Sequence, residues 1–212
     1  MEQIAIIVSL IISIVLHEMA HGYAANALGD PTARLAGRLS GNPLVHLDPL
    51  GSVIIPAFLF LTNAGILFGW AKPVPYNPYN LRNQKYGEAL VAVAGPAVNV
   101  LLAAIFAIII RLADPLNLSA AFIGLASYIV YINLLLACFN MLPFPPLDGS
   151  KILLALLPFA LQQKYHQFIT SIERFGFIVT FIFIFVFINV FWSPFSQVIG
   201  TLFELFTGLR GF

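Results

Sequence analysis

Residues 3–28 read QIAIIVSLIISIVLHEMAHGYAANAL, and this stretch decides the fold. It is long and apolar enough for a transmembrane helix, which needs about 20 such residues. His17, Glu18 and His21 nevertheless lie inside it. Each ionisable group in a bilayer costs on the order of 3 kcal/mol unless it is paired or bound. No Lys or Arg precedes Arg34, so the pattern predicts a retained membrane helix rather than a cleaved signal peptide.

The composition of the whole chain is that of a membrane protein. Of its 212 residues 60% are hydrophobic and 9% are charged, whereas soluble domains average about 25% charged residues. The net charge of +1 gives no indication of a nucleic-acid partner. We expect one membrane-embedded domain over residues 1–212. Its further apolar stretches are 50–69, 88–112, 119–142, 174–192 and, after a helix stop at Ser193 and Pro194, a weaker piece at 194–209.

Two connections rich in Gly and Pro separate these stretches, at residues 29–49 and 70–87. Prolines favour extended backbone and prevent ordinary helix. We therefore expect short membrane-associated β-strands within 32–48 and 70–80. They provide either an edge to which an extended peptide adds as a strand or simple loop punctuation.

His17 and His21 are four positions apart, which places both imidazoles on one face of a helix. This HExxH pattern is typical of zinc sites, where the intervening Glu18 takes a proton from water. A helix end whose polar residues reach interfacial water is the alternative.

Zinc in a catalytic site takes a third protein ligand. The candidates are His46, His166 and the other carboxylates of the chain. Asp148 stands out because it is the second-last residue of NMLPFPPLDG (residues 140–149), a motif that begins at the end of the apolar stretch 119–142. Prolines stiffen that turn and present a carboxylate at a defined point. An ordinary proline turn capped by Asp gives the same pattern.

Three motifs together resemble the site-2 protease family of intramembrane zinc metalloproteases. They are HEMAH in the first apolar stretch, GPAVN at residues 95–99 and NMLPFPPLDG, and they occur in the family's order. The resemblance is to the compact branch without PDZ or CBS domains. One departure is Ser150, where many members have a second Gly.

The resemblance implies one Zn²⁺ per chain, held by His17, His21 and Asp148, with Glu18 as the general base. It also implies that Asn140 and Asn99 lie near the site, with Asn140 on the substrate backbone or the oxyanion. His46, in a loop ahead of Leu47 and Asp48, is a third candidate for substrate contact.

Zinc shared by the histidines and Asp148 constrains the topology, because the first helix and helix 119–142 must then run in the same direction. Segment 50–69 must re-enter rather than cross once. The expected fold is an α-helical integral membrane protein with four full transmembrane helices, this re-entrant segment and short β-strands. The positive-inside rule then places the catalytic end toward the cytoplasm, together with Arg34, Arg38, Lys72, Arg82, Lys85, Lys151, Lys164 and Arg174.

The implied activity is peptide-bond hydrolysis in membrane-spanning or membrane-associated substrates of regulated intramembrane proteolysis, at the cell membrane. The substrate must be extended, because a helix hides its carbonyl groups. The bilayer is one partner, and an adaptor protein is another. The alternatives are a catalytically silent relative that binds membrane segments, and a CaaX-type zinc protease that uses Glu173 or Glu204 as third ligand. A transporter is a third class, but no paired broken-helix repeat supports it.

Overall fold

A computed structural model describes residues 2–54, 58, 61, 71–175 and 177–210, and the regular elements within these ranges are helices. Four helices are long and apolar enough to cross a membrane: Ile4–Ala27, Gly87–Arg111, Ala120–Asn140 and Ile178–Thr207. The prediction of four membrane helices is therefore confirmed.

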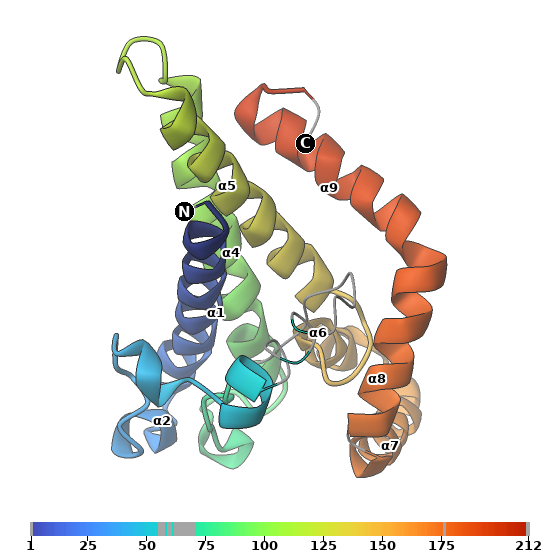
Figure 1. The fold of residues 1–212 in the computed structure, drawn as a ribbon. Helices are drawn as coiled ribbons and strands as arrows, with labels where there is room; N and C mark the ends of the chain where they lie inside the picture. Colours follow the sequence, from blue (N-terminus) through green and yellow to red (C-terminus); the bar gives the residue numbers. More distant parts are fainter. Residues whose placement is uncertain (1, 55–57, 59–60, 62–70, 176, 211–212) are drawn as a thin grey trace.

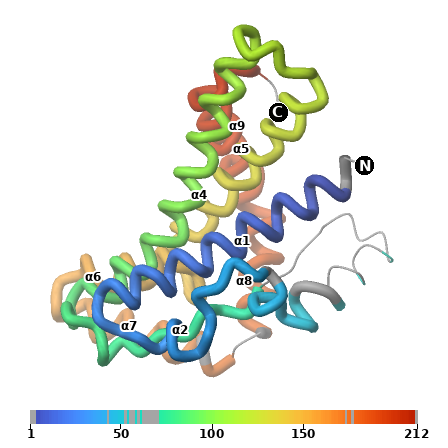
Figure 2. The backbone as a smooth tube through the Cα atoms, turned by 90° about the vertical axis from the view of Figure 1, so that its left-hand side faces the viewer, coloured from blue at the N-terminus to red at the C-terminus, as the bar shows by residue number. Residues whose placement is uncertain are grey.

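Helices α1 (Glu2–Ala27), α4 (Gly87–Arg111) and α5 (Ala120–Asn140) pack together and form the centre of the molecule (Figures 1 and 2). In Figure 1, α1 and α5 descend while α4 rises between them, so α1 and α5 run in the same direction. Small residues such as Ala103, Ala107 and Ala126 fill the contact between α4 and α5. Small side chains let membrane helices approach closely, since dispersion contacts drive their packing.

The last membrane span is one helical run rather than the two predicted pieces. Helix α8 (Phe177–Val186) passes through a π-helical turn (Phe187–Phe191) into α9 (Trp192–Thr207). Pro194 lies in the first turn of α9, where the missing N–H of proline is tolerated. The wider turn ahead of it absorbs the lost helical hydrogen bond, so the helix bends instead of stopping.

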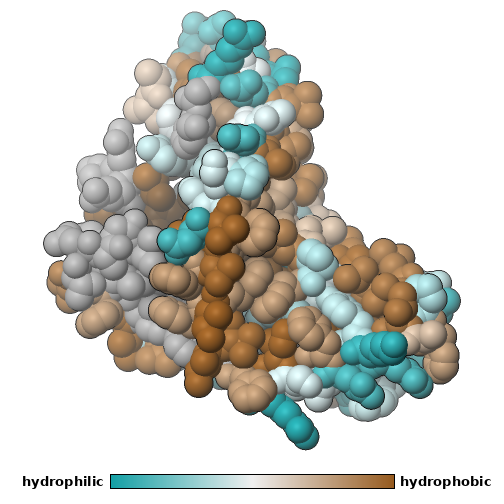
Figure 3. Space-filling model, turned by 90° about the vertical axis from the view of Figure 1, so that its right-hand side faces the viewer, coloured by the Kyte–Doolittle hydropathy of each residue, from teal (hydrophilic) through white to brown (hydrophobic). Residues whose placement is uncertain are grey.

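The outer face of this span carries large apolar side chains, among them Phe181 and Phe185, which are 59% and 62% exposed. Figure 3 shows apolar residues across much of this side of the molecule and polar ones gathered toward its two ends. A soluble protein rarely exposes an apolar surface of this extent. The surface is suited to lipid.

The two connections predicted to hold β-strands form short helical turns instead. They contain α2 (Thr32–Leu35) and 3-10 turns at Pro43–Val45 and Pro78–Asn80, and a π turn at Pro49–Ile54 follows the first connection. The described residues support no strand, and their extended pairing is a single antiparallel bridge between Leu47 and Ala71. Pro73 and Pro75 follow this bridge and lack the N–H groups that a longer ladder requires.

Most of segment 50–69, predicted to re-enter the membrane, lies outside the described residues. The ends of the connection are informative, because Arg82 donates its backbone N–H to the carbonyl oxygen of Leu28 at 2.9 Å. The chain therefore returns to the end of α1 before α4 begins. The re-entrant course predicted for segment 50–69 is not supported by the described residues and stays a prediction.

Asp30 joins the two connections. Its buried carboxylate accepts hydrogen bonds from Asn77 N at 2.6 Å, Asn80 Nδ2 at 2.9 Å and Thr32 N at 3.2 Å. Burial by itself raises the pKa of Asp30, but these hydrogen bonds outweigh it and leave the pKa below its ordinary value of 3.8. The ionised carboxylate thus stabilises the loop that ends α1.

We predict that Asp30→Asn lowers the thermal unfolding temperature at pH 7 by a few degrees, because an amide offers fewer acceptors to these donors. A depressed pKa stabilises the fold above the ordinary pKa and loses that effect as pH falls through the folded value. The difference between variant and wild type should therefore shrink below about pH 4. Thermal unfolding in detergent at several pH values measures it, and a constant difference contradicts the assignment.

Candidate metal centre

Two helices bring the predicted ligands together. His17 and His21 lie on α1, and Asp148 is the first residue of α6 (Asp148–Leu156). Oδ2 of Asp148 lies 3.1 Å from Nε2 of His17 and 3.3 Å from Nε2 of His21, and the two Nε2 atoms are 3.0 Å apart. Among the described residues, these three form the one group of His, Cys, Asp and Glu side chains close enough to share a metal ion.

The three converging atoms are all electron-pair donors. Nδ1 of His21 lies 2.7 Å from the carbonyl oxygen of Val91, which only accepts, so this nitrogen carries the ring proton. Its Nε2 therefore presents a lone pair toward Asp148. Oδ2 of Asp148 is buried and has no hydrogen-bond partner. Donor atoms crowded at these distances repel each other unless a cation lies between them, so the residues fit zinc.

The charge of Asp148 suits this role. Burial by itself raises the pKa of the carboxyl group, but positive charge beside the carboxylate lowers the pKa to about 2. The carboxylate is ionised at neutral pH, and positive charge in the site stabilises it.

Glycines bring the ligands into range. A Cβ atom on Gly95 of α4 would lie 2.5 Å from Nε2 of His21 and 2.6 Å from Nε2 of His17. A Cβ atom on Gly149 would lie 2.2 Å from the carbonyl oxygen of Met141, at the end of α5. Ser150 donates its hydroxyl to the carbonyl oxygen of Leu147 at 2.7 Å and closes the turn at the start of α6. The glycines allow α4 and the turn after α5 to press against the site.

The Glu18 side chain projects from α1 toward the proline-rich connection and contacts it. Its Oε2 accepts a hydrogen bond from Val74 N at 3.0 Å. The neighbouring carbonyl oxygens, of Lys72 and Pro73, accept from Arg38 Nη2 at 2.8 and 3.3 Å. The predicted base is therefore oriented by an extended segment that a buried arginine holds in place.

The three predicted substrate-contacting residues lie in different surroundings. Asn99 is fully buried on α4, with its Oδ1 2.6 Å from Nδ1 of His17, behind the ring. Asn140 is the last residue of α5 and donates its Nδ2 to the carbonyl oxygen of Leu136 at 2.9 Å. His46 is fully buried, and its Nε2 lies 2.9 Å from the carbonyl oxygen of Ser40. No described contact joins Asn140 or His46 to the metal ligands, and their roles stay predictions.

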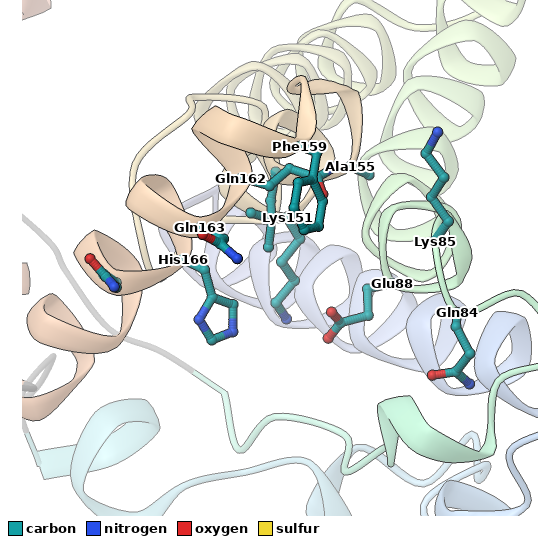
Figure 4. A pocket seen from close by; sticks show the side chains of 11 residues that line it. Gln84, Lys85, Glu88, Lys151, Ala155, Phe159, Gln162, Gln163 and His166 are labelled. Atoms are coloured by element: carbon teal, nitrogen blue, oxygen red, sulfur yellow. The ribbon is translucent and has the colours of Figure 1, made fainter.

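An open pocket of about 520 Å³, lined by both polar and apolar side chains, lies beside α6, between the start of α4 and α7 (Phe159–Phe175). Figure 4 shows Lys151, Glu88 and His166 around it. Lys151 follows Asp148 by one helical turn, and its Nζ lies 5.1 Å from the centre of the Tyr76 ring. Sequence reasoning counted Lys151 among the basic residues of the catalytic end and Tyr76 in an aromatic belt, but it placed neither residue beside the metal ligands. The signal was a lysine three positions after a predicted ligand, which a helix places one turn away.

We predict that Gly95→Ala removes most bound zinc, because the added methyl group would occupy the space of the two ring nitrogens. Gly124→Ala on α5 is the matched control, since a Cβ there meets nothing within 4 Å. The control should bind zinc like the wild type and gain stability, as alanine generally does in helices. Zinc content per protein after purification tests this, and equal zinc in both variants contradicts the geometry.

Comparison with known proteins agrees with this site. The model of peptidase family M50 matches residues 111–187, a range that includes Asp148 but not the two histidines. The chain is 36% identical to "Putative zinc metalloprotease YwhC" of Bacillus subtilis (strain 168), across 96% of this chain and 91% of the relative. It is 26% identical to "Putative zinc metalloprotease Rip2" of Mycolicibacterium smegmatis, across 99% of this chain and 76% of the relative.

A shorter alignment, 48% identical, joins 30% of this chain to 31% of "Putative zinc metalloprotease MJ0611" of Methanocaldococcus jannaschii. No solved structure matches the chain. These relatives confirm the resemblance to site-2 proteases and zinc as the metal of the family. Because the similarity to the Bacillus subtilis protein extends over nearly all of both chains, this chain belongs to peptidase family M50 and is a zinc metalloprotease.

Proposed function

We propose that the chain is an intramembrane protease that hydrolyses peptide bonds of membrane-spanning or membrane-associated proteins, in regulated intramembrane proteolysis. His17, His21 and Asp148 hold the zinc ion, and Glu18 is the general base. The observation that carries the proposal is the convergence of three donor atoms inside a bundle of apolar helices. The carboxylate of Glu18 directly follows one of these donors, His17, in the sequence.

Zinc supplies Lewis acidity: it polarises a carbonyl group and makes water a nucleophile near neutral pH. Glu18 takes the proton of that water and later gives it to the departing amine. The Val74 N–H group at 3.0 Å keeps the Glu18 carboxylate on the side of the extended segment, where a substrate strand would pass. Asn140 is our candidate for holding the substrate backbone or the developing oxyanion.

The substrate enters in an extended conformation, because helical hydrogen bonds would shield its carbonyl groups. The open pocket beside α6 supports a path for the hydrophilic part of such a segment and for water. Its lining includes Lys151, Glu88 and His166, and α6 carries both Lys151 and the metal ligand Asp148. An adaptor protein that presents the substrate remains part of the proposal.

The enzyme acts at the cell membrane with its catalytic end toward the cytoplasm. Support comes from the basic residues, which favour the cytoplasmic side of membrane proteins. Lys72, Arg82 and Lys85 lie in the connection before α4, and Lys151 lies on α6, whereas Arg111 ends α4 at the opposite end of the bundle.

We predict that Glu18→Gln keeps about one zinc per protein but lowers cleavage of a single-span reporter by about 100- to 10,000-fold, since a general base contributes this much. Asp148→Ala should lose both zinc and cleavage, because only two ligands remain. Metal analysis of the purified variants and reporter cleavage in vesicles measure both effects.

Glu204→Gln is the control for these variants. Glu204 is exposed on α9, and a CaaX-type protease would use it or Glu173 as the third ligand. We expect this variant to keep zinc and activity. Loss of zinc in it, with zinc retained in Asp148→Ala, would favour the CaaX-type mechanism. A catalytically silent relative would bind zinc and cleave no reporter even as wild type.

We predict opposite-side labelling for two single cysteines introduced at Tyr79 and Asn117, in a chain whose native Cys138 is replaced by serine. Tyr79 is 87% exposed at the catalytic end, and Asn117 lies in the loop between α4 and α5. A membrane-impermeant thiol reagent applied to intact cells should label the cysteine at 117 alone. The reverse pattern contradicts the orientation, and labelling of both contradicts a membrane crossing by α4.

A further inference from the structure

A chain of buried polar side chains crosses three helices behind His17. It consists of Ser13 on α1, Asn99 on α4 and Asn133 on α5. Asn99 and Asn133 are completely buried, and Ser13 is 2% exposed. Polar side chains inside a membrane bundle are costly unless hydrogen-bonded, and they commonly join helices. Helix packing alone would explain why these polar residues are present. It would not require that each hydrogen bond has a defined donor and a defined acceptor along the chain.

The orientation of each amide follows from a single fixed acceptor. Nδ2 of Asn133 lies 2.9 Å from the carbonyl oxygen of Ile129, which can only accept, so this end of the amide is the NH₂ group. Its second hydrogen faces Ser13 Oγ at 2.9 Å. The opposite end, Oδ1 of Asn133, then accepts from Nδ2 of Asn99 at 2.8 Å.

The same logic reaches the histidine. With its NH₂ group committed to Asn133, Asn99 presents Oδ1 to Nδ1 of His17 at 2.6 Å. An amide oxygen accepts, so Nδ1 of His17 carries the proton and its Nε2 is left with a lone pair. That lone pair is directed at the point where Nε2 of His21 and Oδ2 of Asp148 also converge.

The two histidines are thus oriented by different means. His21 is held by the backbone carbonyl of Val91, which no side-chain substitution removes. His17 depends on one side chain, Asn99. In metal sites the group behind a ligand histidine sets its tautomer and angle, and its loss weakens metal affinity.

We propose that Asn99 is a positioning residue for the zinc site. It fixes the tautomer and angle of His17, while Asn133 and Ser13 hold the Asn99 amide in the orientation this requires. The inference rests on the proposed assignment of His17 as a zinc ligand. It gives Asn99 a task behind the ligand in place of contact with substrate.

The first test compares zinc affinities, measured by competition with a chelator. Asn99→Ala should bind zinc on the order of 10- to 100-fold more weakly. Asn99→Asp should stay within a few-fold of wild type, because a carboxylate oxygen accepts the same hydrogen bond from His17. Its other carboxylate oxygen then faces Oδ1 of Asn133, which the Ile129 carbonyl keeps in place, so this variant should lose thermal stability while it keeps the acceptor for His17.

Thr207→Ala is the control for a purely structural effect. Thr207 lies on α9, far from the predicted metal ligands, and is also buried. Its hydroxyl donates to the carbonyl oxygen of Phe203 at 2.8 Å. Its loss should lower thermal stability without changing zinc affinity. The proposal is overturned if Asn99→Ala binds zinc as tightly as this control, or if Asn99→Asp binds as weakly as Asn99→Ala.

A second measurement needs no variant that might fail to fold. In zinc-loaded wild-type protein with ¹⁵N-labelled histidines, His17 should show its proton on Nδ1. A proton on Nε2, with coordination through Nδ1, overturns the proposal while leaving zinc binding by His17 intact. A wild-type protein that holds no zinc, by contrast, refutes the proposed function and this inference with it.

Discussion

The mutual approach of two imidazole nitrogens and a carboxylate oxygen is the constraint on which the rest of the structure depends. The three atoms lie 3.0–3.3 Å apart, on side chains that are only 8–12% exposed, so water screens them little. Without positive charge between them this arrangement is repulsive, so the site and its metal form one energetic unit. The helices around it can be understood as the means of holding these donors together.

Several features of the bundle serve this end. Parallel α1 and α5 bring the turn after α5, and with it Asp148, level with the histidines of α1 (Figure 1). Helix α4 lies against both rings, with Gly95 leaving room for the nitrogens and Asn99 one turn later reaching the back of His17. The GPAVN motif thus has a physical explanation, because residues four apart share a helix face.

Much of this arrangement could be predicted from the sequence. The spans follow from apolar length. The HExxH spacing predicts that His17 and His21 share one helix face, and the resemblance to site-2 proteases adds Asp148 as the third predicted ligand. The continuation of α8 into α9 could not be predicted, because Ser193 and Pro194 can stop a helix or lie in its first turn, and only the packing decides. The prediction of β-strands was wrong for a related reason. The prolines that favour extended backbone also remove the N–H groups that a β-ladder needs as hydrogen-bond donors.

The role of Asn99 was missed for a different reason. Sequence indicates that Asn99 and Asn133 are polar residues inside apolar helices, but not whether they face substrate, each other or a ligand. Only the directions of the hydrogen bonds from Ile129 to His17 distinguish these cases. The pairing of α1, α4 and α5 at this depth supplies that information.

X-ray absorption at the zinc edge of the purified protein tests the central claim most directly. The account predicts two imidazole nitrogens at about 2.0–2.1 Å, oxygen neighbours at about 2.0–2.2 Å and no sulfur. A sulfur neighbour at about 2.3 Å, or a spectrum lacking imidazole, would show that zinc binds elsewhere and would contradict the account.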